Sequence, residues 1–200
     1  MDIKVVFIFV NASLELIPPS IWKEKSVRKW AKFRKKSPRE LLLDQSIHFS
    51  AITKLDNWRN RGRPDILHRS LLLLADSDLY ELGVLDGIII HTIKGRVFHV
   101  SPDIRPPRHY IRFVGLMEKL LVEKKIISDE GKVLMQEVFS LEGLLRRLGV
   151  QRIILLSEDG EDRHLREIFE LERNRAKKFA IIIGAYPHGS LPKIFLDISH

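Results

Sequence analysis

The sequence contains no cysteine in its 200 residues. This absence excludes a disulfide framework, a thiolate zinc site and a cysteine nucleophile, and it fits the reducing interior of a cell. The eight histidines show no HExxH or HxH spacing, and the GxSxG, GxxxxGK[ST] and GxGxxG motifs are all missing. Metal catalysis, a hydrolase nucleophile elbow, a P-loop and a classical dinucleotide site therefore lack their defining residues, and we expect no metal.

Long hydrophobic runs are missing as well. The strand-like run from Ile3 to Val10 is too short to cross a membrane, and Asn11 and Ser13 follow it without a small-residue cleavage pattern. We therefore expect a cytoplasmic protein. With 44% hydrophobic residues the chain is long enough for one ordinary core, and we expect a single domain over residues 1–200.

The sequence carries an excess of positive charge, with a formal net charge of +8 and a pI near 9.8. Cationic side chains release counterions when they neutralise phosphates, so nucleic acid is the first candidate partner and a membrane surface is the second. A simpler interpretation is that the charge only maintains solubility. The distribution of the charge is therefore more informative than its total.

A basic segment covers residues 23–39, with nine Lys or Arg residues against one acid, Glu24. Three aromatic residues are interleaved with these cations, namely Trp22, Trp30 and Phe33. Cations mixed with aromatic faces suit phosphates and unstacked bases. A solvated helix face whose aromatic side chains turn into the core explains the segment equally well.

Strand and helix signals alternate along the chain, which favours an α/β layer fold. The predicted strands are the apolar, β-branched runs 3–10, 87–93, 96–100, 152–156, 179–184 and 194–198. The predicted helices cover residues 39–55, 65–76, 108–123, 141–148 and 161–173. Lys94 and Gly95 indicate a hairpin between the second and third strands, and residues 152–184 are typical of a right-handed βαβ unit with parallel strands.

The tripeptide Arg63-Pro64-Asp65 is the first candidate site, with Arg59, Arg61, His68 and Arg69 nearby. A carboxylate beside a guanidinium can hold it rigid, so that its remaining donors face a phosphate or a base edge. Asp65 at the start of a helix is also stabilised by the helix dipole, and a capping role explains it without any ligand.

A second candidate site is the run Arg105-Pro106-Pro107-Arg108, which Arg112 follows. If Pro107 begins a helix, Arg108 and Arg112 lie four residues apart on one face, with Arg105 just ahead of them. No acid stands between Arg105 and Phe113, so we expect an anion to meet these arginines. A solvated helix start is the alternative.

A third candidate is the turn Gly184-Ala185-Tyr186-Pro187-His188-Gly189, directly after a predicted buried strand. Ligands of open α/β sheets bind beyond the carboxyl ends of the strands, and glycine lets the backbone approach a ligand closely. By itself the pattern also fits a structural loop between two elements.

Five segments together carry a resemblance to a known family. They are NASLELIP (11–18), RGRPDILHRSLLLLADSDL (61–79), IIIHTIKGRVFHV (88–100), IRPPRHYIRFVGLMEKLL (104–121) and IIIGAYPHG (181–189). The chain resembles the pseudouridine-N1-specific rRNA methyltransferases required for small-subunit biogenesis. The similarity runs through almost the whole chain in the expected order, and RPD…H with RxPRxxxRFxGLM is its specific part.

The resemblance implies a SPOUT-type, trefoil-knotted parallel sheet flanked by helices, with a family-specific β-hairpin and helix extension. It implies a homodimer, S-adenosylmethionine as methyl donor, and a pseudouridine of small-subunit rRNA as substrate, with ribosomal proteins of the small subunit as further candidate partners. The positions that match the family's RNA-contacting residues are Arg63, Arg105, Arg108 and Arg112. The positions that match its cofactor loops are Leu156, Gly184, Gly189, Ile198, Ser199 and His200.

For catalysis, the resemblance suggests that Arg63 orients a flipped base while Asp65 either accepts the N1 proton or only holds Arg63. The family continues past its last strand with a cofactor loop and a final helix that completes the knot, whereas this sequence stops at His200. We therefore expect either a shortened chain or an incomplete cofactor pocket. A non-catalytic RNA-binding assembly factor is the alternative function, because it would keep the arginines and need no methyl donor.

Overall fold

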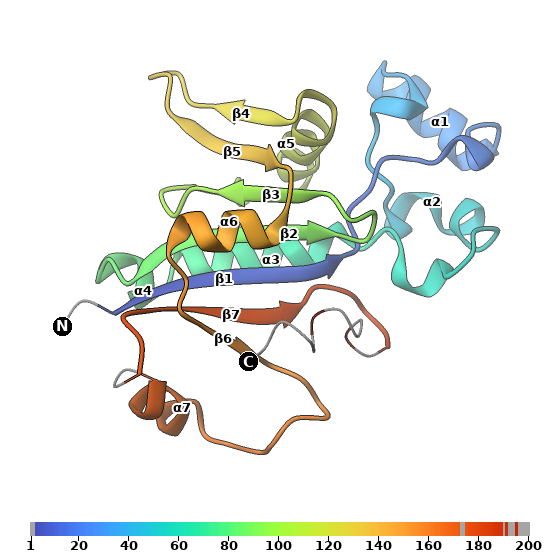
Figure 1. Ribbon diagram of the computed structural model, residues 1–200. Helices are drawn as coiled ribbons and strands as arrows, with labels where there is room; N and C mark the ends of the chain where they lie inside the picture. The colour runs from blue at the N-terminus through green and yellow to red at the C-terminus, as the bar shows by residue number, and fades with distance from the viewer. Residues whose placement is uncertain (1–2, 173–174, 190, 192–194, 196–200) are drawn as a thin grey trace.

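The computed structural model describes residues 3–172, 175–189, 191 and 195, and its centre is a seven-stranded sheet. The strand order is β4-β5-β3-β2-β1-β7-β6 (Figure 1). Strands β2, β1, β7 and β6 are parallel, and β3, β5 and β4 continue the sheet antiparallel. The strands are β1 (Lys4–Ala12), β2 (Leu85–Thr92), β3 (Val97–Val100), β4 (Lys125–Ile127), β5 (Val133–Val138), β6 (Arg152–Leu155) and β7 (Lys178–Gly184).

Helices cover both faces of this sheet, as expected for parallel strands that are joined by crossovers. They are α1 (Lys25–Arg34), α2 (Gln45–Ile52), α3 (Pro64–Ala75), α4 (Asp78–Glu81), α5 (Tyr110–Glu123), α6 (Leu141–Leu148) and α7 (Leu165–Glu172). Short 3-10 helices cover Pro19–Ile21, Pro38–Glu40 and Trp58–Asn60. Within the described residues, every helix is too short or too polar to traverse a lipid bilayer, and no three His, Asp or Glu side chains gather as a metal site would need.

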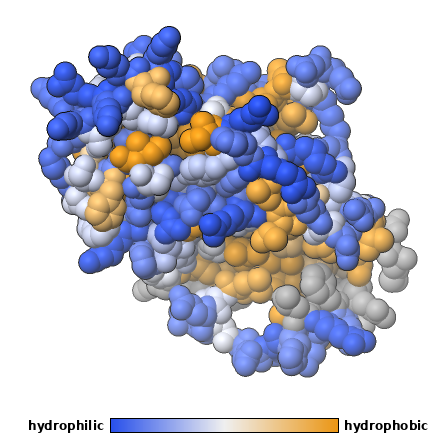
Figure 2. Space-filling model, turned by 180° about the vertical axis from the view of Figure 1, so that it is seen from behind, coloured by the Kyte–Doolittle hydropathy of each residue, from blue (hydrophilic) through white to orange (hydrophobic). Residues whose placement is uncertain are grey.

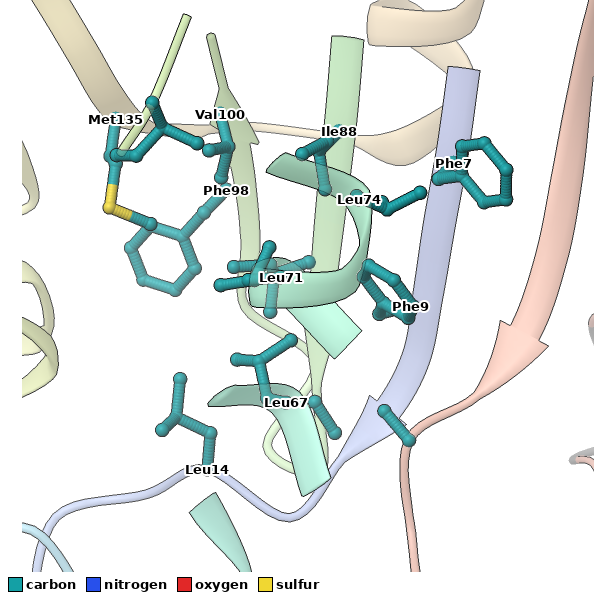
Figure 3. Close-up of a cluster of buried hydrophobic side chains, with 14 of the residues drawn as sticks. Phe7, Phe9, Leu14, Leu67, Leu71, Leu74, Ile88, Phe98, Val100 and Met135 are labelled. Atoms are coloured by element: carbon teal, nitrogen blue, oxygen red, sulfur yellow. The ribbon is translucent and has the colours of Figure 1, made fainter. Parts of the chain in front are cut away.

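Strand β1 is apolar along its length because both of its faces are buried. Phe7 and Phe9 point to the face that α3 and α5 cover, where Leu67, Leu71 and Leu74 of α3 pack against the sheet (Figure 3). The alternate residues Val6, Ile8 and Val10 pack against α6 on the opposite face. Side chains alternate between the two faces of a strand, so a continuous apolar run is what a central strand requires.

A lobe of residues 13–62 lies between β1 and α3 in the sequence, and it contains α1 and α2. Figure 1 places it beside the carboxyl end of β1. The lobe has a core of its own, made of Ile17, Ile21, Val27, Ala31, Leu41, Leu43, Ala51, Ile52 and Leu55. The buried carboxylate of Glu118 on α5 ties the lobe to the sheet, because it accepts hydrogen bonds from Arg34 at 2.9 Å and Lys36 at 2.8 Å.

Several predicted elements are confirmed. The predicted strands at 3–10, 87–93, 96–100, 152–156 and 179–184 correspond to β1, β2, β3, β6 and β7, and β6 and β7 pair in parallel. Pro64 occupies the first turn of α3, and Gly149, with φ of 70°, follows α6 as its C-cap. The shape of the last βαβ unit was therefore visible in the sequence.

Other predicted boundaries were wrong. The helix predicted over 39–55 is only α2, because Leu41, Leu42 and Leu43 are buried in a non-helical segment and the Asp44 side chain caps a new helix by accepting from the Ser46 backbone at 2.8 Å. The helix predicted over 161–173 is the shorter α7. Of the strand predicted over 194–198 the structure describes residue 195 alone, which is helical, and the rest lies outside the described residues.

Candidate active site

Two cavities lie near the carboxyl ends of the parallel strands, where open α/β sheets bind ligands. The first, the Arg63 pocket, has a volume of about 570 Å³. Its walls come from the lobe, from the start of α3 and from the start of α5. The lining residues are Asp44, Gln45, Ser46, Phe49, Arg63, Asp65, His68, Arg69 and Tyr110.

Arg63 and Asp65 form a bidentate ion pair at the start of α3. The Nε and Nη2 groups of Arg63 donate to the two carboxylate oxygens of Asp65 at 2.8 and 2.9 Å. Pro64 between them lacks the N–H that a first helical turn would leave unpaired, so the helix begins without loss at this point. About a third of each side chain is exposed, and the remaining guanidinium N–H groups can face the pocket.

The same pair sets the charge of Asp65. Hydrogen bonds from the Arg63 guanidinium lower the pKa of Asp65 below its ordinary value, against an opposing effect of burial. Asp65 is therefore ionised at neutral pH and is a weak proton acceptor. Its geometry suits a residue that orients Arg63.

Asp44 and Tyr110 form the opposite wall of the Arg63 pocket. The Tyr110 hydroxyl donates to Asp44 Oδ2 at 2.5 Å, while Asp44 Oδ1 accepts from the backbone N–H and hydroxyl of Ser46. Burial, followed by this hydrogen bond, raises the pKa of Tyr110 well above its ordinary value, so the ring stays neutral. The wall is thus a fixed aromatic surface beside a buried carboxylate.

The second cavity, the glycine-loop pocket, has a volume of about 430 Å³ and lies beyond the ends of β6 and β7. Its lining residues are Leu156, Ser157, Glu158, Gly184, Tyr186, Pro187, His188, Gly189 and Leu191. The sequence-predicted residues Leu156, Gly184 and Gly189 therefore meet in one cavity. Ile198, Ser199 and His200, which were predicted to belong to the same site, lie outside the described residues.

Glycine is required at both ends of this loop. A Cβ atom on Gly184 would lie 2.8 Å from Cε1 of Tyr186, whose ring folds back over the glycine. Gly189 has a φ of 92°, a conformation that residues with a side chain rarely adopt. The missing side chain of Gly184 thus makes room for the Tyr186 ring, and Gly189 provides the backbone conformation that the loop needs at its other end.

Backbone hydrogen bonds connect the segments that line the two cavities. The Ser13 N–H donates to the Ala185 carbonyl at 3.1 Å, and the Arg63 N–H donates to the Ser13 carbonyl at 3.2 Å. The Ser13 hydroxyl also donates to the Asn60 carbonyl at 2.6 Å. One residue after β1 thus joins the glycine loop to the start of α3, so the segments that carry the two pockets are linked through Ser13.

Comparison with known proteins identifies the family. The model of the EMG1/NEP1 methyltransferase family matches residues 7–200. The chain belongs to this family. It is 41% identical over 195 residues to the ribosomal RNA small subunit methyltransferase Nep1 of Staphylothermus marinus. The alignment covers 96% of this chain and 83% of that protein. The protein of the same name from Saccharolobus solfataricus is 39% identical, with 96% and 84% covered.

The structural comparison agrees with the family. The crystal structure of Archaeoglobus fulgidus Nep1 bound to S-adenosylhomocysteine matches with a TM-score of 0.82 and 36% sequence identity, over 98% of this chain and 84% of that one. The expected SPOUT-type fold, a largely parallel sheet flanked by helices, is therefore confirmed, as is the methyltransferase class. The hairpin β2–β3 and helix α5, with β4 and β5, form the expected extension.

Within this family member, the arginines of residues 105–112 are arranged differently from the prediction. Pro107 does not begin a helix, because α5 begins at Tyr110, so Arg108 and Arg112 do not share a helix face. The Pro107 carbonyl instead accepts a hydrogen bond from His68 of α3 at 2.7 Å. This hydrogen bond fixes the segment that precedes α5.

These arginines are also not all uncompensated, as the sequence had suggested. Arg108 donates to Asp76 at 2.9 Å, and the Arg105 guanidinium lies over the Tyr80 ring at 3.7 Å from its centre. The sequence around the arginines does not predict these contacts. Asp76 follows the last residue of α3, and Tyr80 belongs to α4. Both arginines remain exposed, and neither lines the Arg63 pocket.

Sequence reasoning missed the Asp44–Tyr110 wall. The pair is 66 residues apart in sequence, so no local pattern connects its members. The run Asp44-Gln45-Ser46 before a helix is a recognisable capping signal, and it would have identified the helix start. Tyr110 lies inside the RPPRHYIRF motif, in which the arginines carry the stronger signal for a binding role.

Proposed function

We propose that this chain transfers a methyl group from S-adenosylmethionine to N1 of a pseudouridine in small-subunit rRNA. The single observation that carries the proposal is the link through Ser13 between the segments that line the two cavities. A flipped base in the Arg63 pocket would lie near a ligand of the glycine-loop pocket, because the Ser13 backbone is hydrogen-bonded to Arg63 on one side and to Ala185, which follows Gly184, on the other. Family relatives are named small-subunit rRNA methyltransferases, and the Archaeoglobus relative binds S-adenosylhomocysteine, which supports this substrate and cofactor.

The glycine-loop pocket fits such a cofactor. Gly189 leaves its backbone open to close approach, Gly184 makes room for the Tyr186 ring that lines the pocket, and Leu156 supplies an apolar contact. When bound, the cofactor supplies an electrophilic sulfonium methyl group. We further propose that Ile198, Ser199 and His200 complete this site, as the family resemblance implies.

The Arg63 pocket fits an unstacked base. Phe49 and Tyr110 offer aromatic surfaces, and guanidinium N–H groups of Arg63 can donate to the carbonyl oxygens of a uracil ring. N1 of pseudouridine carries a proton because the ring is joined to ribose through carbon. The positive charge of Arg63 favours the ring after loss of this proton, in the pocket where negative charge develops.

The reaction forms an N1–CH₃ bond, breaks the S–CH₃ bond and releases the N1 proton. We propose that this proton passes to water and that Asp65 serves as the orienting partner of Arg63, because the pKa of Asp65 is lowered by the ion pair. Most of the acceleration then comes from alignment of the base and from its electrostatic environment.

Arg105, Arg108 and Arg112 are proposed to bind phosphates of the same RNA. Arg108 and Arg112 are each two residues from Tyr110 of the Arg63 pocket in sequence, and the Arg108 guanidinium extends from there to Asp76 beyond the far end of α3. The ion pair between Arg108 and Asp76 is highly exposed and therefore weak, so that a phosphate can replace the carboxylate.

Mass spectrometry of small-subunit rRNA tests the proposal. The rRNA is incubated with the protein and S-adenosylmethionine, digested to nucleosides, and compared with rRNA in which the pseudouridine is replaced by uridine. We expect a mass gain of one methyl group on pseudouridine and none on uridine, since uridine N1 has no proton to lose. Methylation of both RNAs, or of neither, contradicts the proposal.

Calorimetry separates this proposal from the alternative of a non-catalytic assembly factor. Such a factor would bind rRNA through the same arginines but would give no saturable heat with S-adenosylmethionine. We expect saturable binding of one cofactor molecule for each glycine-loop pocket.

We also propose that the chain forms a homodimer. The space-filling view shows apolar surface in a hollow beside the part of the sheet that α3 leaves uncovered (Figure 2). Ile154, Leu156 and Ile183, which belong to this face, are only partly buried. Light scattering in solution tests for a dimer.

We further propose that ribosomal proteins of the small subunit bind this chain. Co-purification with these proteins tests the proposal.

A further inference from the structure

A groove between α1 and α2 is not used by the reaction proposed above. It has a volume of about 530 Å³ and is lined by Ser26, Lys29, Trp30, Phe33, Ser46 and Ile47. The Trp30 and Phe33 rings are stacked with centres 5.2 Å apart and planes 25° apart, which makes one wide aromatic surface. Phe33 is 73% exposed, although the lobe has a hydrophobic core within reach.

The sequence left two interpretations of this segment open, and the structure separates them. Val27 and Ala31 are the buried residues of α1, whereas Phe33 points away from the core. The aromatic residues of the segment are therefore not all core residues, as the simpler interpretation required. An exposed aromatic surface of this size is a feature of interaction sites.

Uncompensated positive charge surrounds the groove. Lys25, Arg28, Lys29 and Lys32 of α1 are exposed, and among the described residues none of them has an acidic partner. Glu24, the only acid of the segment, is paired with Lys54 at 2.8 Å. In Figure 2 the corner of the molecule that the lobe forms is mostly blue, with a few orange side chains among the polar ones.

The groove is next to the Arg63 pocket. Ser46 of α2 lines both cavities, and Phe49, one turn further along α2, lines the Arg63 pocket and is 54% exposed. Phe49 in turn meets the edge of Trp58, with ring centres 5.8 Å apart. A strand that leaves the Arg63 pocket over Ser46 therefore meets aromatic faces and cations in succession.

We propose that the α1–α2 groove binds the single-stranded RNA that flanks the flipped base, with bases stacked on Phe33 and Trp30 and phosphates paired with Lys29 and its neighbours. Aromatic faces mixed with unpaired cations match an unstacked strand, since every base has a face to stack and every nucleotide carries a negative charge. An acidic protein segment would satisfy the lysines but not the flat aromatic surface. The inference rests on the proposed function, because it takes the Arg63 pocket as the base site.

Binding measurements with RNAs of two lengths test the groove. One RNA is a trinucleotide with pseudouridine at its centre, and the other extends it by about six nucleotides on each side, within the range that such surfaces bind. Phe33→Ala is expected to weaken binding of the long RNA about tenfold, the loss of one stacked base, and to leave the trinucleotide unaffected. Lys29→Gln is expected to lower the slope of log K against log salt by about one for the long RNA only.

Matched controls remove an exposed side chain elsewhere. Phe139→Ala deletes a fully exposed phenylalanine that follows β5, and Lys125→Gln neutralises an exposed lysine of β4. Neither change should alter the binding of either RNA. Because Phe33 is exposed, its variant should keep the melting temperature of the parent protein, which is checked first.

Each outcome decides the inference. Equal losses for the two RNAs, no loss for either, or an equal effect of Phe139→Ala would overturn it, and so would a change in oligomeric state caused by Phe33→Ala, because that result assigns the groove to a second copy. If the unmodified protein methylates neither RNA, the proposed function fails, yet the binding comparison still tests the groove separately.

Discussion

Arg61 and Arg63 stand on either side of Gly62, and each makes two hydrogen bonds to a carboxylate, but they serve different regions of the molecule. Arg61 donates to the two oxygens of Glu15 at 2.6 Å each, and both side chains are buried. Arg63 is bound to Asp65 with similar geometry at the edge of a pocket, about a third exposed. One pair joins distant segments of the fold, and the other fixes a guanidinium at the edge of the pocket that we propose as the base site.

The difference follows from where the partners come from. Glu15 is 46 residues before Arg61, so their ion pair closes the lobe of residues 13–62 at its base. Asp65 is two residues after Arg63 and constrains only local structure. Gly62 separates the two arginines with a φ of 65°, and a Cβ there would lie 2.8 Å from Ile52 Cδ1. We therefore propose that the buried pair is structural and that the partly exposed pair is functional.

Glu15→Ala should break the structural half of this comparison and have the largest effect. Arg61 would stay buried without its carboxylate, and we expect the free energy of unfolding to fall by about 3–5 kcal/mol. Urea denaturation measures the change. The double variant Glu15→Leu/Arg61→Met removes both charges and should recover most of the loss. A single-variant loss as small as that of an exposed pair would show that the lobe does not depend on this contact.

Arg63→Ala should break the functional half. We expect methylation of pseudouridine RNA to fall about 10²- to 10³-fold, the usual effect of removing a donor that stabilises developing charge. The free energy of unfolding should change by less than about 1 kcal/mol, because the pair is partly exposed. Arg166→Ala, which deletes an exposed arginine that donates to Glu170 on α7, is the matched control. If Arg63→Ala keeps both its turnover and its stability, Arg63 does not take part in the reaction.

Gly184→Ala extends the comparison to the glycine-loop pocket, where we expect an effect on cofactor affinity that is smaller than the loss of methylation in Arg63→Ala. The new Cβ would lie 2.8 Å from the Tyr186 ring and displace it into the pocket. We expect the dissociation constant for S-adenosylmethionine to rise about tenfold in calorimetry. RNA binding without cofactor should not change.

The control for this variant is Gly115→Ala in α5, where a Cβ would meet nothing within 4 Å. Its cofactor affinity should equal that of the parent protein. If Gly184→Ala also binds S-adenosylmethionine as tightly as the parent protein does, the glycine loop does not contact the cofactor.

Much of the sheet could be predicted because its strands carry their own signal. Val6, Ile8 and Val10 alternate with Phe7 and Phe9, and a run that is apolar on both faces can only be a central strand. The glycine loop and the Arg63–Asp65 pair were also visible, since each is local in sequence.

Contacts between distant residues could not be predicted in this way. The Glu15–Arg61 pair and the Asp44–Tyr110 wall join residues 46 and 66 positions apart, and nothing in either segment specifies its partner. Arg108 looked uncompensated because the fold, and not the sequence neighbourhood, supplies Asp76. The predicted helix over 39–55 failed for a related reason, since Leu41 and Leu43 are buried in the lobe core and Leu42 in the core of the sheet, all three in a non-helical segment.

Asp65→Asn makes the finest test, because it keeps the shape of the functional pair and removes its charge. The lowered pKa of Asp65 means that the pair stabilises the fold above the ordinary pKa of the carboxyl group, and that this contribution is lost as the pH falls through the lowered value. Partial exposure limits the effect to less than about 1 kcal/mol. The parent protein should therefore lose slightly more stability than Asp65→Asn when the pH is lowered below about 4.

At neutral pH the same variant decides what Asp65 does for catalysis. If the carboxylate only orients Arg63, Asp65→Asn should weaken the binding of pseudouridine RNA several-fold and lower turnover at saturating RNA far less than Arg63→Ala does. Unchanged RNA affinity with a large loss of turnover would instead identify Asp65 as the proton acceptor. The structure favours the first outcome, because a carboxylate with both oxygens bound to Arg63 has little remaining affinity for a proton.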